Sequence, residues 1–193
     1  MANSQTGFGF RMLGRQDGAR ATFGTRPYPI LYTDTTTIGR GCTVALDSTG
    51  YIRLATTGDS YFLGVFDGGF KTDTSLPQRF TYFGAYTYSS TAVSGSVYGY
   101  VIDDPNAEFE VRVSGGPLTF ADVGANATFI AGTVNTNSGW STDLLNATVT
   151  TSTTAPYRIV GLSGFVGNDN ASSYNIVNVK LNSANLSSTL GQV

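Results

Sequence analysis

The feature that most constrains this chain is an alternating stretch near its middle, residues 98–113 (YGYVIDDPNAEFEVRV). From residue 108 to residue 113, charged side chains alternate with Phe and Val. Because successive side chains of a strand point to opposite faces of its sheet, this pattern predicts a strand with one buried face. Residues 98–102 predict a second strand, and residues 103–106 (Asp-Asp-Pro-Asn) predict the turn between them. We therefore expect a β-hairpin with the other strands arranged around it.

The composition favours an all-β fold of small barrel-type or sandwich-type antiparallel sheets. Thr, Ser, Gly, Val and aromatic residues dominate the 193 residues, whereas Glu and Lys occur only twice each. Strand formers are therefore abundant and helix formers scarce. The length is sufficient to bury a substantial core in one large or two small domains.

The absence of histidine, together with a single cysteine, Cys42, excludes several classes of chemistry. A Ser-His-Asp triad, a Cys-His pair and the usual zinc and non-haem iron ligand sets cannot be built. A disulfide within the chain is also impossible. We therefore expect a protein that is not an enzyme and that needs no metal or other cofactor.

Charge and hydropathy limit the partners. The net charge of −2 gives no reason to expect nucleic acid as a partner. No apolar run approaches membrane-spanning length, and the N-terminus lacks the apolar core of a signal peptide. We expect no membrane association, and a reducing cytoplasm before assembly.

Residues 1–26 combine glycines, arginines and aromatic residues without a period of 2 or 3.6. Such a segment cannot bury itself well, so it is either disordered or laid on another surface. The aromatic residues favour the second interpretation, because disordered tails usually lack them. We expect an extended N-terminal arm whose anchors are Phe8, Phe10, Arg11, Arg15, Arg20, Phe23 and Arg26.

Pro27 begins the folded part as an extended edge segment, because proline cannot donate to a β-ladder. Residues 39–66 contain three short strands separated by Gly/Asp turns, which predict a meander in a small barrel or sandwich. A glycine-containing break follows residue 66. We therefore divide the chain into an N-terminal barrel-like part at 27–70 and a C-terminal β part at 71–193, while 27–193 can also form one compact domain.

An aromatic-rich region between residues 80 and 100 predicts an association surface. A soluble monomer that exposed this many Tyr and Phe side chains would carry an unusually large apolar patch. We expect self-association through Tyr82, Tyr86, Tyr88, Tyr98 and Tyr100. Alternatively, the same tyrosine-rich face forms the floor of a sugar-binding site. Aromatic side chains are, however, also ordinary strand residues and ordinary interface anchors.

The carboxylate cluster of Asp103, Asp104, Glu108 and Glu110 does not predict a site. Its spacing differs from that of an EF-hand calcium loop. Adjacent turn residues also do not provide the two carboxylates across a sugar cleft that glycoside hydrolysis needs. We interpret Asp103 and Asp104 as part of a turn.

Two parts of the chain resemble structural proteins of tailed bacteriophages. The segment GCTVALDSTGYIRLATTGDSYFLGVF is similar to small β-barrel head-decoration and cement proteins. VIDDPNAEFEV, VGANATFIAG, SGWSTDLLNATVTTSTTAPYRIVGL and NIVNVKLN resemble the second half of a capsid-associated protein common in marine phages. The matching turn and strand positions are Asp103, Asp104, Pro105, Phe109, Glu110, Gly124, Asn126, Gly132, Gly139, Arg158 and Gly161. The similarity covers roughly residues 39–182, and its motifs are structural.

The resemblance implies a capsid decoration protein that binds the outer surface of the head and cements neighbouring major capsid subunits. Such proteins are usually trimers, and the N-terminal arm would contact the major capsid protein. The alternative is a carbohydrate-binding or receptor-binding virion module that uses the tyrosine-rich face.

Overall fold

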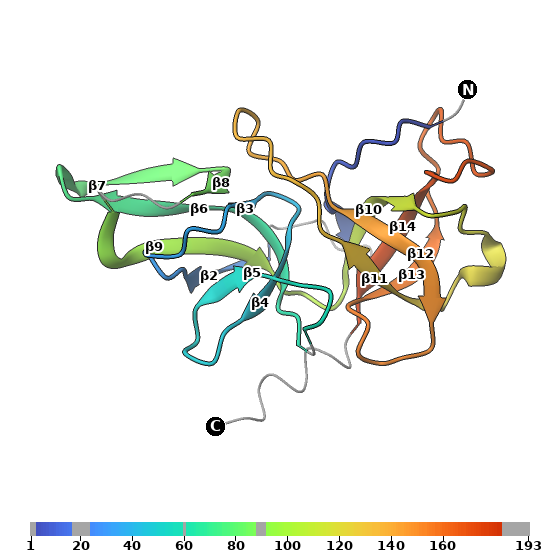
Figure 1. Ribbon diagram of the computed structural model, residues 1–193, viewed down its shortest axis with the longest axis horizontal. Coiled ribbons are helices and arrows are strands. Elements are labelled where there is room, and N and C mark those ends of the chain that lie inside the picture. The colour runs from blue at the N-terminus through green and yellow to red at the C-terminus, as the bar shows by residue number, and fades with distance from the viewer. Residues whose placement is uncertain (1–2, 17–23, 60, 88–91, 183–193) are drawn as a thin grey trace.

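The computed structural model describes residues 3–16, 24–59, 61–87 and 92–182, which form two lobes of β-sheet along the long axis of the molecule (Figure 1). Within these residues the helical content is one 3-10 turn, η1 (Phe120–Asp122). The predicted all-β fold with antiparallel sheets and a small barrel is confirmed.

The first lobe contains a sheet in the order β2-β9-β6-β4-β5, with β7 paired to the other edge of β6. Its strands are β2 (Thr25–Pro29), β4 (Thr43–Leu46), β5 (Ile52–Leu54), β6 (Gly64–Asp73), β7 (Leu76–Phe83) and β9 (Ala92–Ile102). A short pair, β3 (Ile38–Gly39) and β8 (Ala85–Tyr86), adjoins it. A bridge between Ile30 and Ile52 brings the two ends of the sheet together around an apolar core.

The second lobe contains a sheet in the order β1-β10-β12-β11-β13-β14. Its strands are β1 (Arg11–Arg15), β10 (Ala107–Ser114), β11 (Asn126–Ile130), β12 (Leu144–Thr150), β13 (Tyr157–Leu162) and β14 (Ile176–Leu181). Because β14 also pairs with β10, every strand except β1 is part of a closed barrel. The alternation predicted for β10 is present, with its buried side chains facing the barrel core.

The predicted hairpin between β9 and β10 is wrong, although both strands and the turn are present. The amide of Asn106 donates to Asp104 Oδ1 (2.8 Å), and the amide of Ala107 donates to the Asp104 carbonyl (3.0 Å). However, β9 lies in the first lobe and β10 in the second, so residues 103–106 carry the chain from one lobe to the other. The alternating pattern specified a buried face but not the partner strand.

The N-terminal segment supplies a partner strand for β9 and another for β10. β1 pairs with β10, from Arg11 opposite Glu110 to Arg15 opposite Ala107, and β2 pairs with β9. Between them, the Gln16 amide donates to the Asn106 carbonyl (3.0 Å). The described part of residues 1–26 therefore runs antiparallel to the β9–β10 segment across both lobes, and the separate arm is not confirmed.

Phe10 shows how firmly this segment is attached. Its side chain is 2% exposed and stacks on Tyr157 of β13, with ring centroids 4.1 Å apart and 9° between the planes. Gly9 and Gly41 allow this approach: both have positive φ angles, and a Cβ on Gly41 would lie 2.9 Å from the Phe10 amide nitrogen. That amide donates to the Gly41 carbonyl (3.0 Å). The two glycine motifs, GFGF and GRG, therefore pack against each other.

The predicted meander is also wrong, because β4 pairs with both β5 and β6 and lies between them. β6 then continues through residue 70 as far as Asp73, with a bulge between Phe66 and Gly69 instead of a break. Strands on both sides of residue 70 thus belong to one sheet. The crossing between the lobes lies at residues 103–106.

We predict that Phe10→Ala lowers the free energy of unfolding by about 3–5 kcal/mol, because it removes a buried ring and leaves a cavity between the lobes. Phe8→Ala is the matched control in the same motif, and it should cost no more than about 1.5 kcal/mol because Phe8 is only half-buried. Urea unfolding of both variants measures the difference. Equal small losses would show that the N-terminal segment does not pack in the core.

Candidate functional site

The acidic and thiol groups of the described residues are used in the fold. No group of three or more His, Cys, Asp or Glu side chains there could hold a metal ion. Burial, followed by the charge of Asp143, raises the pKa of the buried Cys42 thiol to about 12, so the thiolate is not available. Asp104 pairs with Arg15 (3.3 Å) and Asp103 with Arg26 (3.6 Å). The two turn carboxylates therefore fasten the N-terminal segment on either side of the crossing.

A buried polar cluster joins the two lobes at Asp143. Its side chain is 1% exposed, and its carboxylate accepts from the amides of Gly132 (2.9 Å) and Thr43 (3.4 Å). Thr43 of β4 also shares a hydrogen bond with the Tyr157 hydroxyl of β13 (2.7 Å). Burial raises the pKa of Asp143. Because solvent does not reach this carboxyl, we assign it to the junction between the lobes and not to catalysis.

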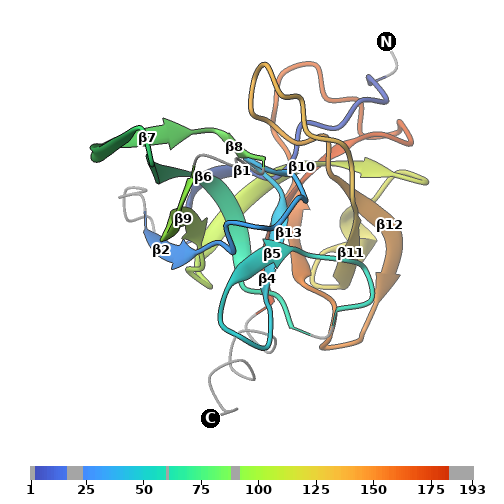
Figure 2. The ribbon, with the colours of Figure 1, turned by 60° about the vertical axis from the view of Figure 1, so that its left-hand side comes forward.

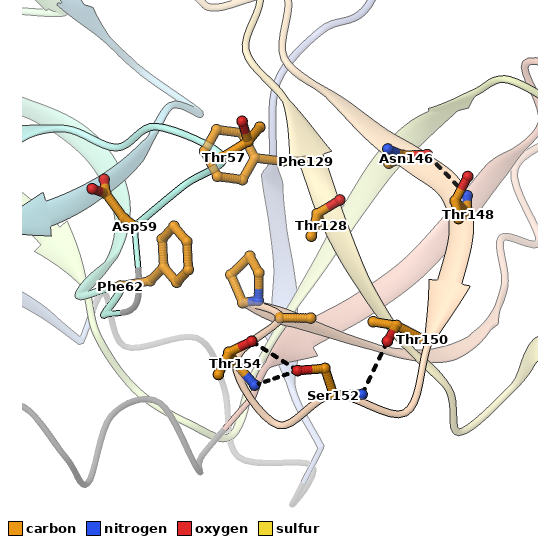
Figure 3. A pocket seen from close by; sticks show the side chains of 12 residues that line it. Thr57, Asp59, Phe62, Thr128, Phe129, Asn146, Thr148, Thr150, Ser152 and Thr154 are labelled. Atoms are coloured by element: carbon orange, nitrogen blue, oxygen red, sulfur yellow. Dashed lines mark hydrogen bonds between the residues drawn. The ribbon is translucent and has the colours of Figure 1, made fainter.

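A groove lined mainly by threonine and serine lies between the lobes, with a volume of about 320 Å³ (Figure 3). The Ser152 and Thr154 hydroxyl groups share a hydrogen bond (2.7 Å), and the Thr150 hydroxyl accepts from the Ser152 amide (3.1 Å). Its one charged group, Asp59, is held by two hydrogen bonds from Arg53 (2.8 Å each), which lower the pKa of Asp59. The groove therefore offers no free charge to a ligand.

The first exposed surface of interest is a cation–aromatic cluster made of Phe8, Arg11, Arg112 and Trp140. The guanidinium carbon of Arg11 lies 4.6 Å from the ring centre of Phe8 and 5.6 Å from that of Trp140. The guanidinium carbon of Arg112 lies 5.4 Å from the same Phe8 ring. Two cations thus share one aromatic ring, a geometry that holds both side chains in place.

The two arginines of this cluster lack acidic partners in the part of the chain that the structure describes. Among the described residues, no carboxylate forms an ion pair with Arg11 or Arg112. Glu110 lies opposite Arg11 on the β1–β10 pair, but its carboxylate accepts a hydrogen bond from Ser163. Arg112 donates to the Ser4 carbonyl, while its Nε is buried and finds no hydrogen-bond partner among residues 3–16, 24–59, 61–87 and 92–182. Burial, and then the positive charge of Arg11, lower the pKa of Arg112.

The fold of the N-terminal segment creates this cluster. A Cβ at Gly7 would lie 2.1 Å from the Thr142 carbonyl oxygen, so glycine is needed for the chain to pass close to the segment just before β12. Phe10 then turns into the core, while Phe8 and Arg11 remain at the surface. Trp140 is placed by a bridge to Arg40.

The second exposed surface is the aromatic face of the first lobe, made of Phe70, Phe80, Tyr82, Tyr98 and Tyr100. Phe70 lies at its centre, with ring centroids 5.3 Å from Phe80, 6.3 Å from Tyr82, 5.4 Å from Tyr98 and 5.6 Å from Tyr100. Register explains this, since Tyr82 and Tyr98 are the cross-strand partners of Phe70 on β7 and β9. Tyr82 is 73% exposed and Phe80 59% exposed.

Three of the predicted tyrosines, Tyr82, Tyr98 and Tyr100, therefore share one face. Tyr86 does not: it is 1% exposed, and its hydroxyl donates to the Tyr32 carbonyl (2.9 Å), so its assignment to a surface is corrected. Its sequence parity with Tyr82 was misleading because the chain bends at Gly84, between β7 and β8. Tyr88 lies outside the described residues.

The predicted arm anchors have separate locations. Phe8 and Arg11 belong to the exposed cation–aromatic cluster, whereas Phe10 belongs to the core, which corrects its assignment as a surface anchor. Arg15 and Arg26 pair with the turn carboxylates described above. Arg20 and Phe23 lie outside the described residues. Sequence reasoning missed Arg112 and Trp140, because their contacts with Phe8 and Arg11 join segments far apart in the chain.

Comparisons with protein-family models, with curated proteins and with solved structures find no match to this chain. In the part of the chain that the structure describes, no helix is long and apolar enough to cross a membrane.

We predict that Asp143→Asn changes the pH dependence of stability. The pKa of Asp143 is raised on folding, so its contribution to stability is fully present below the unfolded-state pKa of about 3.9 and is lost as pH rises through the folded-state pKa. The Asn variant cannot titrate, so the free energy of unfolding of the variant should improve relative to the natural protein as pH rises from 4 to 7.

The control for this measurement is Asp59→Asn, since the pKa of Asp59 is lowered in the folded protein. The contribution of Asp59 is present above the unfolded-state pKa and is lost as pH falls through the folded-state pKa, which is the opposite dependence. Chemical denaturation at several pH values measures both variants. A pH-independent difference for Asp143→Asn would contradict the assignment of a buried, titrating carboxyl.

Proposed function

We propose that this chain is a structural virion protein of a tailed bacteriophage, which binds the outer capsid surface and links neighbouring major capsid subunits. The resemblance of residues 39–182 to decoration and cement proteins supports this function. The observation that carries it is the cation–aromatic cluster, in which Arg11 and Arg112 are held near the surface and form no ion pair with any acidic residue that the structure describes.

The partner that fits such a cluster is an acidic patch on a protein surface. A guanidinium binds a carboxylate through two parallel hydrogen bonds, and stacking on an aromatic ring fixes its orientation in advance. Less side-chain entropy is then lost on binding. Arg112 is already partly desolvated, so less water has to be removed from its guanidinium when a carboxylate binds. In this proposal, Phe8 and Trp140 supply the apolar contact area around the two charges.

The proposal includes association between copies of the chain, as a trimer of the kind that the resemblance implies. β7 is available for this contact, because among the described strands it pairs only with β6. Figures 1 and 2 show β7 at the outer margin of the first lobe. β7 also carries the exposed side chain of Phe80. An edge strand with aromatic side chains readily pairs with another chain.

We predict that Arg11→Ala and Arg112→Ala each weaken capsid binding by about 30-fold or more, because truncating one partner of a buried interfacial ion pair costs on the order of 2–5 kcal/mol. Phage heads that lack the protein are titrated with each purified variant, and occupancy is measured by gel densitometry and cryo-electron microscopy. Arg158→Ala, which removes an exposed arginine of β13, is the matched control and should bind normally.

The circular dichroism spectrum of each variant confirms that it is folded before the titration. The proposed contact is wrong if the Arg11→Ala/Arg112→Ala double variant occupies the heads as fully as the natural protein. Failure of the natural protein itself to bind the heads would contradict the decoration function as a whole.

A further inference from the structure

A pocket of about 300 Å³ lies beside the aromatic face, where the bulge of β6 meets the end of β7. Tyr82 and Tyr100 form one part of its lining, and Arg40 and Asp67 form another. Its volume is at the lower end of the range for small-molecule sites, in which a few polar groups converge beside aromatic surface.

The carboxylate of Asp67 is the unusual group in this pocket. It accepts no hydrogen bond from any described residue, and burial raises its pKa. Arg40 lies beside it but is poorly placed to satisfy it: Arg40 Nε is 3.9 Å from Asp67 Oδ1 and instead donates to the Asp67 carbonyl (3.1 Å). Among the described residues, the partly desolvated Asp67 carboxylate therefore has no hydrogen-bond donor, and the hydrogen bond of the neighbouring Arg40 uses its Nε and not its terminal nitrogens.

The aromatic side chains of the pocket are held in position before any ligand binds. The rings of Tyr82 and Tyr100 both pack on Phe70, which fixes them although Tyr82 is largely exposed. Gly69 lines the pocket between the rings and Asp67, and the Phe83 ring packs closely against it, since a Cβ at Gly69 would lie 2.8 Å from that ring. Two aromatic rings and a pair of charged side chains, Arg40 and Asp67, thus line one small space.

We propose that this pocket binds a neutral pyranose sugar. The C–H face of a sugar ring stacks on tyrosine, and two neighbouring hydroxyl groups can each donate to Asp67 while accepting from Arg40. An anionic ligand is disfavoured by Asp67 and a cationic one by Arg40, because each would meet a like charge. The inference goes beyond capsid attachment, since it assigns a small-molecule site in which neither Arg11 nor Arg112 takes part.

The test is saturation-transfer difference NMR with four probes: methyl α-D-glucoside, methyl α-D-mannoside, methyl β-D-galactoside and N-acetylglucosamine. At least one probe should bind saturably, with a dissociation constant on the order of 1–10 mM for a single ring in so shallow a site. Tyr82→Ala and Asp67→Asn should each weaken that probe by about tenfold, the loss expected for one stacking contact or one charged hydrogen bond.

Two control variants make the result specific. Tyr82→Phe should retain binding, because stacking needs the ring and not the hydroxyl, whereas Tyr61→Ala removes an exposed tyrosine elsewhere and should have no effect. Sedimentation at the NMR concentration checks that all variants share one oligomeric state. The inference is overturned if no probe binds saturably, or if binding survives both Tyr82→Ala and Asp67→Asn. Neither result bears on capsid occupancy, which depends on the other surface.

Discussion

The antiparallel pairing of the N-terminal segment with the β9–β10 segment is the interaction on which the rest of the structure depends. β2 lies along β9 in one lobe, β1 lies along β10 in the other, and Phe10 enters the core between them. Without this pairing, β9 and β10 would be joined only by the backbone of residues 103–106. The ion pairs of Asp103 and Asp104 contribute at most about 1 kcal/mol each, because their arginines are partly exposed. The burial of Phe10 and the backbone hydrogen bonds of the two strand pairs therefore contribute most to the attachment of the N-terminal segment.

The same segment also determines the surface chemistry. Because Gly7 and Gly9 bring the backbone against the second lobe, Phe8 is left at the surface between Arg11 and Arg112. The aromatic face has a different origin, in the cross-strand register of β7, β6 and β9 around Phe70. One surface presents oriented charge and the other presents aromatic rings. The proposed capsid contact and the proposed sugar site therefore use different residues.

The sequence was sufficient for the all-β class, the strands at β9 and β10, and the turn between them, because period-2 alternation and turn residues are local signals. The sequence was insufficient to predict which strands pair, since the buried face of β10 does not reveal that β1 and β14 are its neighbours. In the described part of residues 1–26, side-chain alternation is interrupted at Gly7 and Gly9, where close packing leaves no room for a side chain. Arg112 and Trp140 could not be found, because a contact between distant segments leaves no spacing to detect.

The most direct test of this account is hydrogen–deuterium exchange of the intact chain, read at single residues by NMR. If the N-terminal segment is an integral part of both lobes, the hydrogen-bonded amides of β1 and β2 should be protected to a degree comparable with those of β9 and β10, and far more than the exposed turn at Thr49 and Gly50. Exchange of β1 and β2 at the rate of an unstructured peptide, with β9 and β10 still protected, would contradict the account.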